Sequence, residues 1–195
     1  MPARAKPVPP ALSPICAAAP RYAPGAALPP YRHVPGRTPH PVNHPEGHSF
    51  NQPEPPPTPL NPAGWRLNKI YLFGVDLYNQ GYLWESHEAW ESLWKTAGRR
   101  SIEGRFLQSL IFNSAALLKF HVGRAKGGVT HSRRAVAQLE AVLDALEGAR
   151  SFMGVDLPEW KEQLEKCYAP LWRSAASRRA TLSDAAPCLR LRGEA

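Results

Sequence analysis

The sequence predicts an all-α protein: an antiparallel bundle of about five helices, preceded by a largely irregular proline-rich arm. Nineteen of the 22 prolines lie in residues 1–62, whereas all six tryptophans lie between Trp65 and Trp172. Proline removes a backbone donor and fixes φ, so the first third of the chain cannot form regular helices or central strands. Beyond Trp65 the apolar residues recur at helical spacing, and no segment alternates as a strand would.

Composition divides the chain into four segments. Residues 1–30 are rich in proline and alanine and are predicted to be a disordered tail. Residues 31–62 form a proline- and histidine-rich arm, which would either pack on the bundle or stay mobile with its histidines in turns. Residues 64–178 form the helical bundle domain, whose size allows a single core without disulfides or metals to hold it. Residues 179–195 form a C-terminal tail.

The first two helices are expected over residues 66–79 and about 82–96. The first carries apolar side chains at i and i+3 or i+4, and Asn79-Gln80-Gly81 ends it. The second holds most of the stretch GYLWESHEAWESLW, and Gly98 ends it. Three tryptophans, three glutamates and a histidine therefore share one short helix.

Three further helices complete the predicted bundle. The third covers about residues 101–124, beginning with a serine N-cap, and the glycine pair at 127–128 breaks it. The fourth covers about residues 130–147. The fifth starts near 157–158, where proline occupies a first-turn position. Short loops marked by glycine favour antiparallel neighbours.

The charge of the chain is basic but dispersed. The formal net charge is +8, and the excess includes no run of five or six like charges. Arginine and lysine cluster only at helix ends, where they serve solubility. A compact basic stripe would favour nucleic acid, so the dispersed excess argues against specific nucleic-acid binding.

The cysteines and the hydropathy bear on location. Cys16, Cys167 and Cys188 are far apart and odd in number, so they predict neither a disulfide framework nor a CxxC pair. A reducing compartment follows from that interpretation. No apolar run is long enough to span a membrane, and prolines interrupt any stretch resembling a secretory signal. We therefore expect a cytoplasmic protein.

The charged residues of the second helix fall on one side of it. At about 100° per residue, His87, Glu88 and Glu91 converge on a patch at the edge of the apolar stripe. Trp84 overhangs this patch. Glu85 lies on the opposite side of the helix, where contact with solvent would satisfy it.

A structural interpretation of the patch is a buried polar network. Buried carboxylates need a hydrogen-bond donor, a cation or a metal. Lys119 on the third helix is the best placed cation, and Gln108 and Asn113 offer amide groups. In that case His87 and Glu91 would fix how the second and third helices pack.

A functional interpretation is a metal or catalytic site. The pattern HExxE is similar to the HExxH of zinc peptidases, with Glu91 in place of the second histidine. His40 and His48 of the arm would complete a divalent metal site with His87 and Glu91. Glu88 or Glu91 would act as general base if the reaction were hydrolytic. The chain lacks an ExxH motif, which argues against a di-iron bundle.

Two segments together resemble a known family. YNQGYLWESHEAWESLW and RFLQSLIFNSAALLKFHVG are similar to the paired helices of the domain of unknown function 309 family, over about residues 68–147. The positions that match are Gly81, Glu85, His87, Glu88, Glu91, Trp94, Gln108, Leu110, Ile111, Ala115, Ala116 and Lys119. The resemblance implies a compact helical fold and no particular reaction. The arm segment VPGRTPHPVNHPEGHSF is similar to an extension found in longer members.

The chain departs from the family pattern at three positions. Ser86 replaces the usual alanine, Ser109 the usual glycine and Phe112 a usual glutamine. A phenylalanine side chain forms no ordinary hydrogen bonds, so the last departure argues against any polar role that the family gives that position.

Two functions of different class follow from these observations. One is a site for a small polar ligand or a divalent metal, whose substrate the sequence leaves open. Its lining would be Glu85, Gln108, Asn113, Lys119, Trp84 and Trp94. The other is a non-enzymatic helical scaffold, whose aromatic surface and arm would contact a protein partner or a second copy of the chain. Whether the protein is an enzyme stays open.

Overall fold

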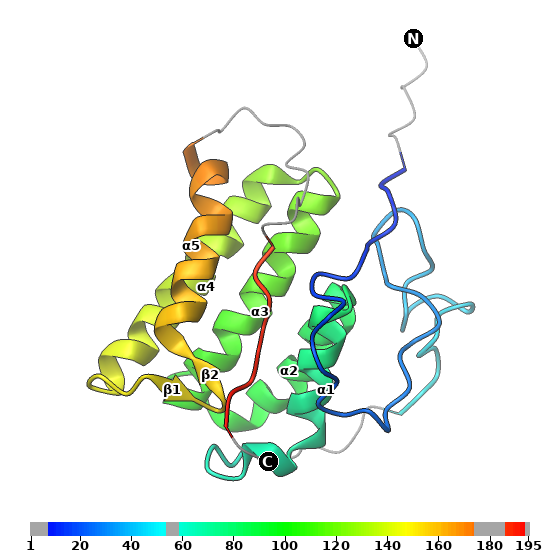
Figure 1. The fold of residues 1–195 in the computed structure, drawn as a ribbon. Helices are drawn as coiled ribbons and strands as arrows, with labels where there is room; N and C mark the ends of the chain where they lie inside the picture. The colour runs from blue at the N-terminus through cyan, green and yellow to red at the C-terminus, as the bar shows by residue number, and fades with distance from the viewer. Residues whose placement is uncertain (1–7, 54–58, 174–185, 194–195) are drawn as a thin grey trace.

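Five α-helices form the body of the protein, which confirms the predicted all-α class (Figure 1). The computed structural model describes residues 8–53, 59–173 and 186–193. The helices are α1 (Lys69–Asn79), α2 (Leu83–Ala97), α3 (Ile102–His121), α4 (Ala125–Ala145) and α5 (Leu157–Arg173), and a 3-10 turn, η1 (Trp65–Leu67), precedes α1. Helix α3 lies at the centre and packs against both α2 and α4.

The ends of the helices follow from local chemistry. The side chain of Asn68 accepts a hydrogen bond from the backbone of Tyr71 at the start of α1, and Ser101 does the same for α3. Between α1 and α2 the chain turns at Gly81, whose φ is 78°. A Cβ atom there would lie 2.2 Å from the carbonyl oxygen of Ser13. Glycine therefore allows both the turn and the close approach of the N-terminal segment.

The boundary between α3 and α4 differs from the prediction. Gly127 and Gly128 lie inside α4, and the break falls earlier, at Gly123 with a φ of 75°. A Cβ atom on Gly128 would lie 2.7 Å from the ring of Phe120 on α3. The glycine pair therefore serves close helix packing, so the prediction that it breaks a helix was wrong.

A two-stranded hairpin was also not predicted. Strands β1 (Ser151–Phe152) and β2 (Val155–Asp156) pair antiparallel through a turn at Met153 and Gly154, both with positive φ. Strands of two residues are too short to show an alternating pattern. The hydroxyl of Tyr71 donates to the carbonyl of Met153 at 2.9 Å, which ties the hairpin to α1.

The core contains a buried polar network as well as apolar side chains. Trp90, Tyr78 and Tyr168 are fully buried. The side-chain amide of Asn113 donates a hydrogen bond to the hydroxyl of Tyr78 at 2.9 Å. The Oδ1 atom of Asn113 accepts a hydrogen bond from the hydroxyl of Tyr168 at 2.6 Å. These bonds join α1, α3 and α5, so three helices share one satisfied set of buried polar groups.

The N-terminal segment lies against α1 and α2 (Figure 1). Composition predicts a disordered tail over residues 1–30, yet Leu12 is buried and residues 15 and 16 donate backbone hydrogen bonds to the carbonyl of Asn79, both at 2.9 Å. The buried carboxylate of Asp76 accepts from the Arg21 side chain and from two backbone amides. A proline-rich chain can be ordered when the bundle supplies acceptors for its remaining N–H groups.

The C-terminal segment is held by the same helix. The side chain of Asn79 donates to the carbonyl of Leu189 at 2.8 Å and accepts from its N–H at 3.1 Å. Cys16 and Cys188 form a disulfide with a Cα–Cα distance of 5.5 Å. The expectation of no disulfide was wrong, because cysteines 172 residues apart meet on one face of α1. The inference of a reducing compartment thereby loses its basis.

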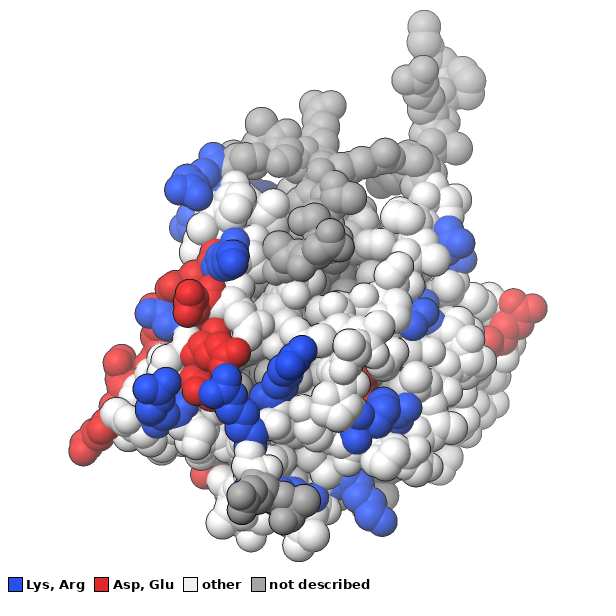
Figure 2. All heavy atoms as spheres, in the orientation of Figure 1, with Lys and Arg blue, Asp and Glu red and all other residues white. Residues whose placement is uncertain are grey.

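The surface carries mixed charge. On the face shown in Figure 2, acidic and basic side chains lie next to one another near α5 and the hairpin. Lys161 forms ion pairs with Glu140 and Glu165, and Arg192 forms ion pairs with Asp156 and Glu159. Among the helices that the structure describes, none is long and apolar enough to cross a membrane.

Candidate metal centre

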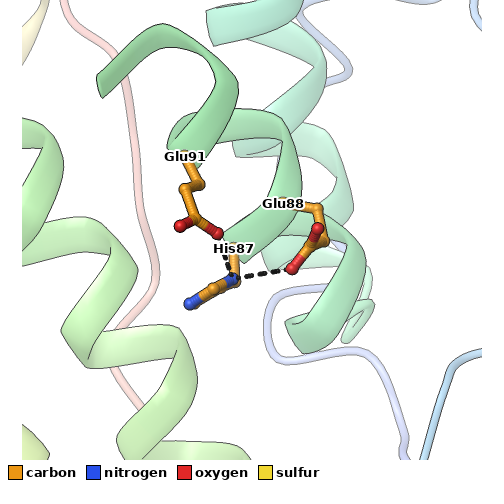
Figure 3. Close-up of side chains that lie close together, drawn as sticks. All are labelled: His87, Glu88 and Glu91. Carbon is orange, nitrogen blue, oxygen red and sulfur yellow. Dashed lines mark hydrogen bonds and ion pairs between the residues drawn. The ribbon is translucent and has the colours of Figure 1, made fainter. Parts of the chain in front are cut away.

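Three ligand-type side chains converge on the exposed side of α2. The Nδ1 atom of His87 lies 3.2 Å from an oxygen of Glu88 and 3.8 Å from an oxygen of Glu91. Figure 3 shows the imidazole between the two carboxylates, all from one helix. One atom from each residue can be chosen so that all lie within 4.8 Å of one another. This cluster, His87, Glu88 and Glu91, is the α2 triad.

The α2 triad is accessible to solvent. The side chains of His87, Glu88 and Glu91 are 28%, 45% and 36% exposed. No hydrogen bond or ion pair joins the triad to Lys119 or Gln108 in the described part of the chain. The structure therefore does not support the interpretation of these residues as a buried structural network.

The donor set fits a divalent cation. One imidazole nitrogen and two carboxylates are ligands that zinc and manganese accept, and all three are near enough to share one ion. Three protein ligands leave coordination positions open to water or to a substrate. The triad is thus suited to metal binding by both its chemistry and its spacing.

The arm histidines do not join the triad. Among described residues, the group that could hold a metal contains neither His40 nor His48. The Nε2 atom of His48 lies 3.3 Å from Glu85, and the ring of His40 packs edge-on against Trp84 at 5.2 Å. The four residues predicted as one metal site are therefore not brought together, because His40 and His48 contact Trp84 and Glu85 in the first turn of α2 instead of His87.

Glu85 is buried rather than solvated. It is 6% exposed, and its Oε1 atom accepts a hydrogen bond from the backbone of His33 at 2.8 Å. Its Oε2 atom is buried and has no hydrogen-bond partner. The prediction of a solvated side chain was wrong, because the arm covers the side of α2 that points away from the bundle. Burial raises the pKa of this carboxyl, and the bonds from His33 and His48 partly oppose the rise.

The buried side chain of His33 forms hydrogen bonds with other residues of the arm. It is 4% exposed, and its Nδ1 atom lies 3.1 Å from the carbonyl of Pro39. A carbonyl can only accept, so Nδ1 carries the proton in the neutral ring. Burial lowers the pKa of His33, and the charges of His40 and His48 lower it further. The neutral ring packs edge-on against Trp84 at 5.6 Å.

The other predicted site residues are dispersed. Asn113 is fully buried in the tyrosine network, away from the triad. Trp94 is partly buried under the guanidinium of Arg99, 5.3 Å from the ring centroid. Gln108 and Lys119 are partly exposed on α3. Among the described residues, no hydrogen bond, ion pair or ring contact joins the six predicted lining residues to one another.

A basic cluster that includes a histidine missed by the sequence reasoning lies across α3 and α4. It consists of Lys119, His131 and Arg134. The ring of His131 contacts Phe112 edge-on at 5.9 Å, and the guanidinium of Arg134 lies 5.8 Å from the same ring. The Nδ1 atom of His131 also lies 2.8 Å from the carbonyl of Gly127, one turn earlier on α4, and the local sequence carries no signal for this cluster.

The three departures from the family pattern each have a structural role. Ser86 and Ser114 share a buried hydrogen bond of 3.1 Å between α2 and α3. Ser109 donates to the carbonyl of Ala135 at 2.8 Å, which joins α3 to α4. Phe112 supplies the ring that His131 and Arg134 contact.

Comparison with known families agrees with the two-helix resemblance. Residues 71–130 match the model described as domain of unknown function (DUF309), which covers most of α1, all of α2 and α3, and the start of α4. A comparison with curated proteins gives no match. The paired helix motifs pack against one another in the structure, and the family model matches the segment that contains them, so the resemblance to the DUF309 family is confirmed over residues 71–130.

Proposed function

We propose that the protein binds a divalent metal ion through the α2 triad. The observation that carries this proposal is the mutual approach of His87, Glu88 and Glu91 to within 4.8 Å at a solvent-accessible place. Two carboxylates this close repel one another, and a cation between them relieves the repulsion. The neighbouring imidazole completes a ligand set of mixed nitrogen and oxygen donors.

Such a centre has a defined chemistry to offer. A bound divalent ion polarises an oxygen of a ligand or lowers the pKa of a bound water. Glu88 is the most exposed of the three side chains, so it would hold the ion with one carboxylate oxygen and would use the other to accept a proton from that water. His87 would supply the nitrogen ligand, and its imidazole lies beside both carboxylates. The reaction that would use this arrangement is a hydrolysis at an exposed site.

The experiment is a titration of metal-free protein with Mn²⁺ and Zn²⁺ by isothermal calorimetry. The full chain binds one ion, and His87→Ala and Glu91→Gln each weaken binding by about tenfold or more. His44→Ala is the matched control, because this residue is exposed in the arm and, among the described residues, its side chain accepts a hydrogen bond only from the backbone of Glu46. Because the triad is exposed, the variants keep the melting temperature of the metal-free protein.

The contrary result is equally clear. Binding of Mn²⁺ and Zn²⁺ that is unchanged in both triad variants, or lost only in the His44 control, removes the triad as a metal site. The helical scaffold would then be the better description, with function sought in the arm and its contacts.

A further inference from the structure

Residues 31–50 of the arm, called here the arm segment, are held on the first turn of α2 by polar and aromatic contacts. The backbone N–H of His33 donates to the carboxylate of Glu85 at 2.8 Å. The rings of His33 and His40 both lie edge-on to the ring of Trp84, with centroids 5.6 Å and 5.2 Å from it. The two imidazole rings are also neighbours, with centroids 5.1 Å apart. This histidine pair, His33 and His40, therefore lies between the arm and α2.

His40 is neutral in the docked arm segment. Its Nδ1 atom accepts hydrogen bonds from the backbone N–H groups of Val42 and Asn43, both at 3.3 Å. A ring nitrogen that accepts carries no proton, so the proton of the neutral ring is on Nε2. A second proton would turn Nδ1 into a donor that faces two other donors. A charged His40 therefore does not fit the turn that follows it.

His33 is neutral in the docked arm segment for a different reason. Its Nδ1 atom already donates to the carbonyl of Pro39 at 3.1 Å, so a second proton would go to Nε2. Among the described residues, Nε2 has no hydrogen-bond partner. Because His33 is buried, a new N–H group there would remain unsatisfied. Burial lowers the pKa of His33, and the charges of His40 and His48 lower it further, which agrees with this geometry.

The charged and titratable groups around the histidine pair come from α2 and from the arm itself. From α2, the carboxylate of Glu85 is occupied by the backbone of His33 and by the Nε2 atom of His48 at 3.3 Å. Within the arm, Tyr31 contacts the ring of His48, and Arg32 donates to a backbone carbonyl at the end of α1. Among the described residues, no acidic side chain pairs with either ring of the histidine pair. A positive charge on these rings would therefore lack a partner.

The chain is anchored on both sides of the arm segment. Before it, Arg21 pairs with the buried Asp76 of α1 at 2.8 Å, and Cys16 is joined to Cys188. After it, Trp65 of η1 is buried in the core. Figure 1 shows the segment between these anchors as an irregular loop beside α1 and α2. Loss of its contacts with α2 would therefore free a loop without separating it from the bundle.

We propose that the arm segment is a pH-sensitive latch, which is docked on α2 while His33 and His40 are neutral and is released when they are protonated. Protonation places like charges on two rings that lie 5.1 Å apart, and it removes the backbone hydrogen bonds to His40. Release uncovers Trp84 and Glu85, so the surface that α2 offers to a ligand or a protein depends on pH. The latch does not depend on metal binding by the α2 triad.

The direction of the pH dependence follows from His33. Its pKa is lower in the docked arm segment than the ordinary value of 6.5, so the released arm binds the proton more readily. Docking is therefore fully present above pH 6.5. It is weakened as the pH falls from 6.5 through the lower pKa that His33 has when docked.

The test follows the backbone amide signals of residues 33, 42 and 43 by nitrogen–proton NMR of the metal-free full chain, as the pH is lowered from about 7.5 to about 5. In the wild type the three signals move together to the positions of an unfolded segment, with a midpoint between about pH 5 and pH 6.5. The helical circular dichroism stays constant. In the double variant His33→Asn with His40→Asn the signals keep their positions, because an asparagine amide offers a donor and an acceptor but takes up no proton.

His44→Asn is the matched control. This histidine is exposed in the same arm, and its Nδ1 atom also accepts from a backbone N–H group. The control releases the arm segment at the same pH as the wild type. Glu85 is present in every one of these proteins, so its own protonation cannot account for a difference between them.

Two results overturn the latch: a wild type that stays docked at about pH 5, or a double variant that is released at the wild-type pH. A double variant that is already released at about pH 7.5, because it lacks the ring contacts with Trp84, is replaced by His40→Asn alone. A midpoint about half a pH unit or more below that of the wild type then supports the latch, and an unchanged midpoint overturns it.

Discussion

Glu85 carries an unusual electrostatic cost. Its side chain is 5% exposed, one oxygen accepts from the arm, and the other makes no hydrogen bond in the described structure. The first turn of a helix favours an anion, which offsets part of the cost. An unsatisfied buried polar group still costs about 1–3 kcal/mol. The arm is therefore held by a residue that destabilises the protein when it is ionised.

We predict that Glu85→Gln stabilises the metal-free protein at pH 8 by about 1 kcal/mol. The amide keeps an acceptor for the backbone of His33 and removes the buried charge. Because the pKa of Glu85 is raised in the folded state, the folded protein binds its proton more readily than the unfolded chain. The stability that this carboxyl group contributes to the wild-type protein is therefore fully present below its ordinary pKa of 4.5. It is lost as the pH rises through the higher pKa that the group has in the folded state.

The measurement is the melting temperature of both proteins between pH 4 and pH 8. The advantage of the glutamine variant grows with pH across this range, while Glu46→Gln, an exposed change in the same arm, shows no such trend. An advantage that is independent of pH, or a loss of stability at pH 8, contradicts the assignment of a buried charge.

The sequence predicts the part of the site whose residues all lie on one helix. The angular order of residues on α2 predicts that His87, Glu88 and Glu91 converge, and the structure contains that cluster. The same reasoning fails for Glu85, because a helix alone does not show what covers its outer side. The ring of His40 contacts that of Trp84. These residues are far apart in the sequence, so no local sequence pattern predicts their contact.

At the scale of elements, the contact of α3 with α4 depends on glycine. Gly128 faces Phe120, which is 2% exposed and stacks on Tyr168 with ring centroids 6.0 Å apart. Gly127 faces Lys119, a flexible and partly exposed side chain. The side chain beside Gly127 can therefore move to make room for a Cβ atom, whereas the packed ring beside Gly128 cannot.

We predict that alanine destabilises the protein at Gly128 but does not destabilise it at Gly127. Alanine favours the helix by about 1 kcal/mol at either site. At Gly128 the new methyl group meets the ring of Phe120, and overpacking of about 1–3 kcal/mol outweighs the gain. Gly128→Ala should lower the free energy of unfolding by about 1 kcal/mol, and Gly127→Ala should leave it unchanged or raise it. Urea titration measures both, and stabilisation by Gly128→Ala would show that α3 and α4 are not closely packed there.

The helices themselves were predictable because their periodicity is local. All five exist close to their expected positions, with errors at the ends. The largest error concerned Gly127 and Gly128, since a glycine pair indicates a break unless a neighbouring helix is known to approach. The hairpin β1–β2 was not predicted for a different reason. It is stabilised by contacts with η1, α1 and α3, such as that between Phe152 and Phe106, whose ring centroids lie 5.2 Å apart.

At the scale of the whole molecule, the two ends of the chain are joined. The disulfide between Cys16 and Cys188 lies next to Asn79, which bonds to both segments. Cys167 is the remaining cysteine; it is buried, and burial raises the pKa of its thiol to about 12. Closing a loop of this length restricts the unfolded chain by about 5 kcal/mol in the chain-entropy model.

We predict that reduction destabilises the protein by about 2–5 kcal/mol. The melting temperature of the wild type falls in the presence of a phosphine reductant, whereas the double variant Cys16→Ser with Cys188→Ser melts at one temperature with or without it. Thiol titration in denaturant should find one thiol before reduction and all three cysteines after it. Three reactive thiols in the untreated protein would show that the disulfide does not form.

The position of Asn79 has a consequence for synthesis. Its side-chain partner is Leu189, 110 residues later in the chain. During synthesis α1 can form early, but the buried amide of Asn79 lacks this partner until Leu189 emerges from the ribosome. The helices in the family-matched segment are therefore made early, yet the contacts around Asn79 are completed only after Leu189 has left the ribosome.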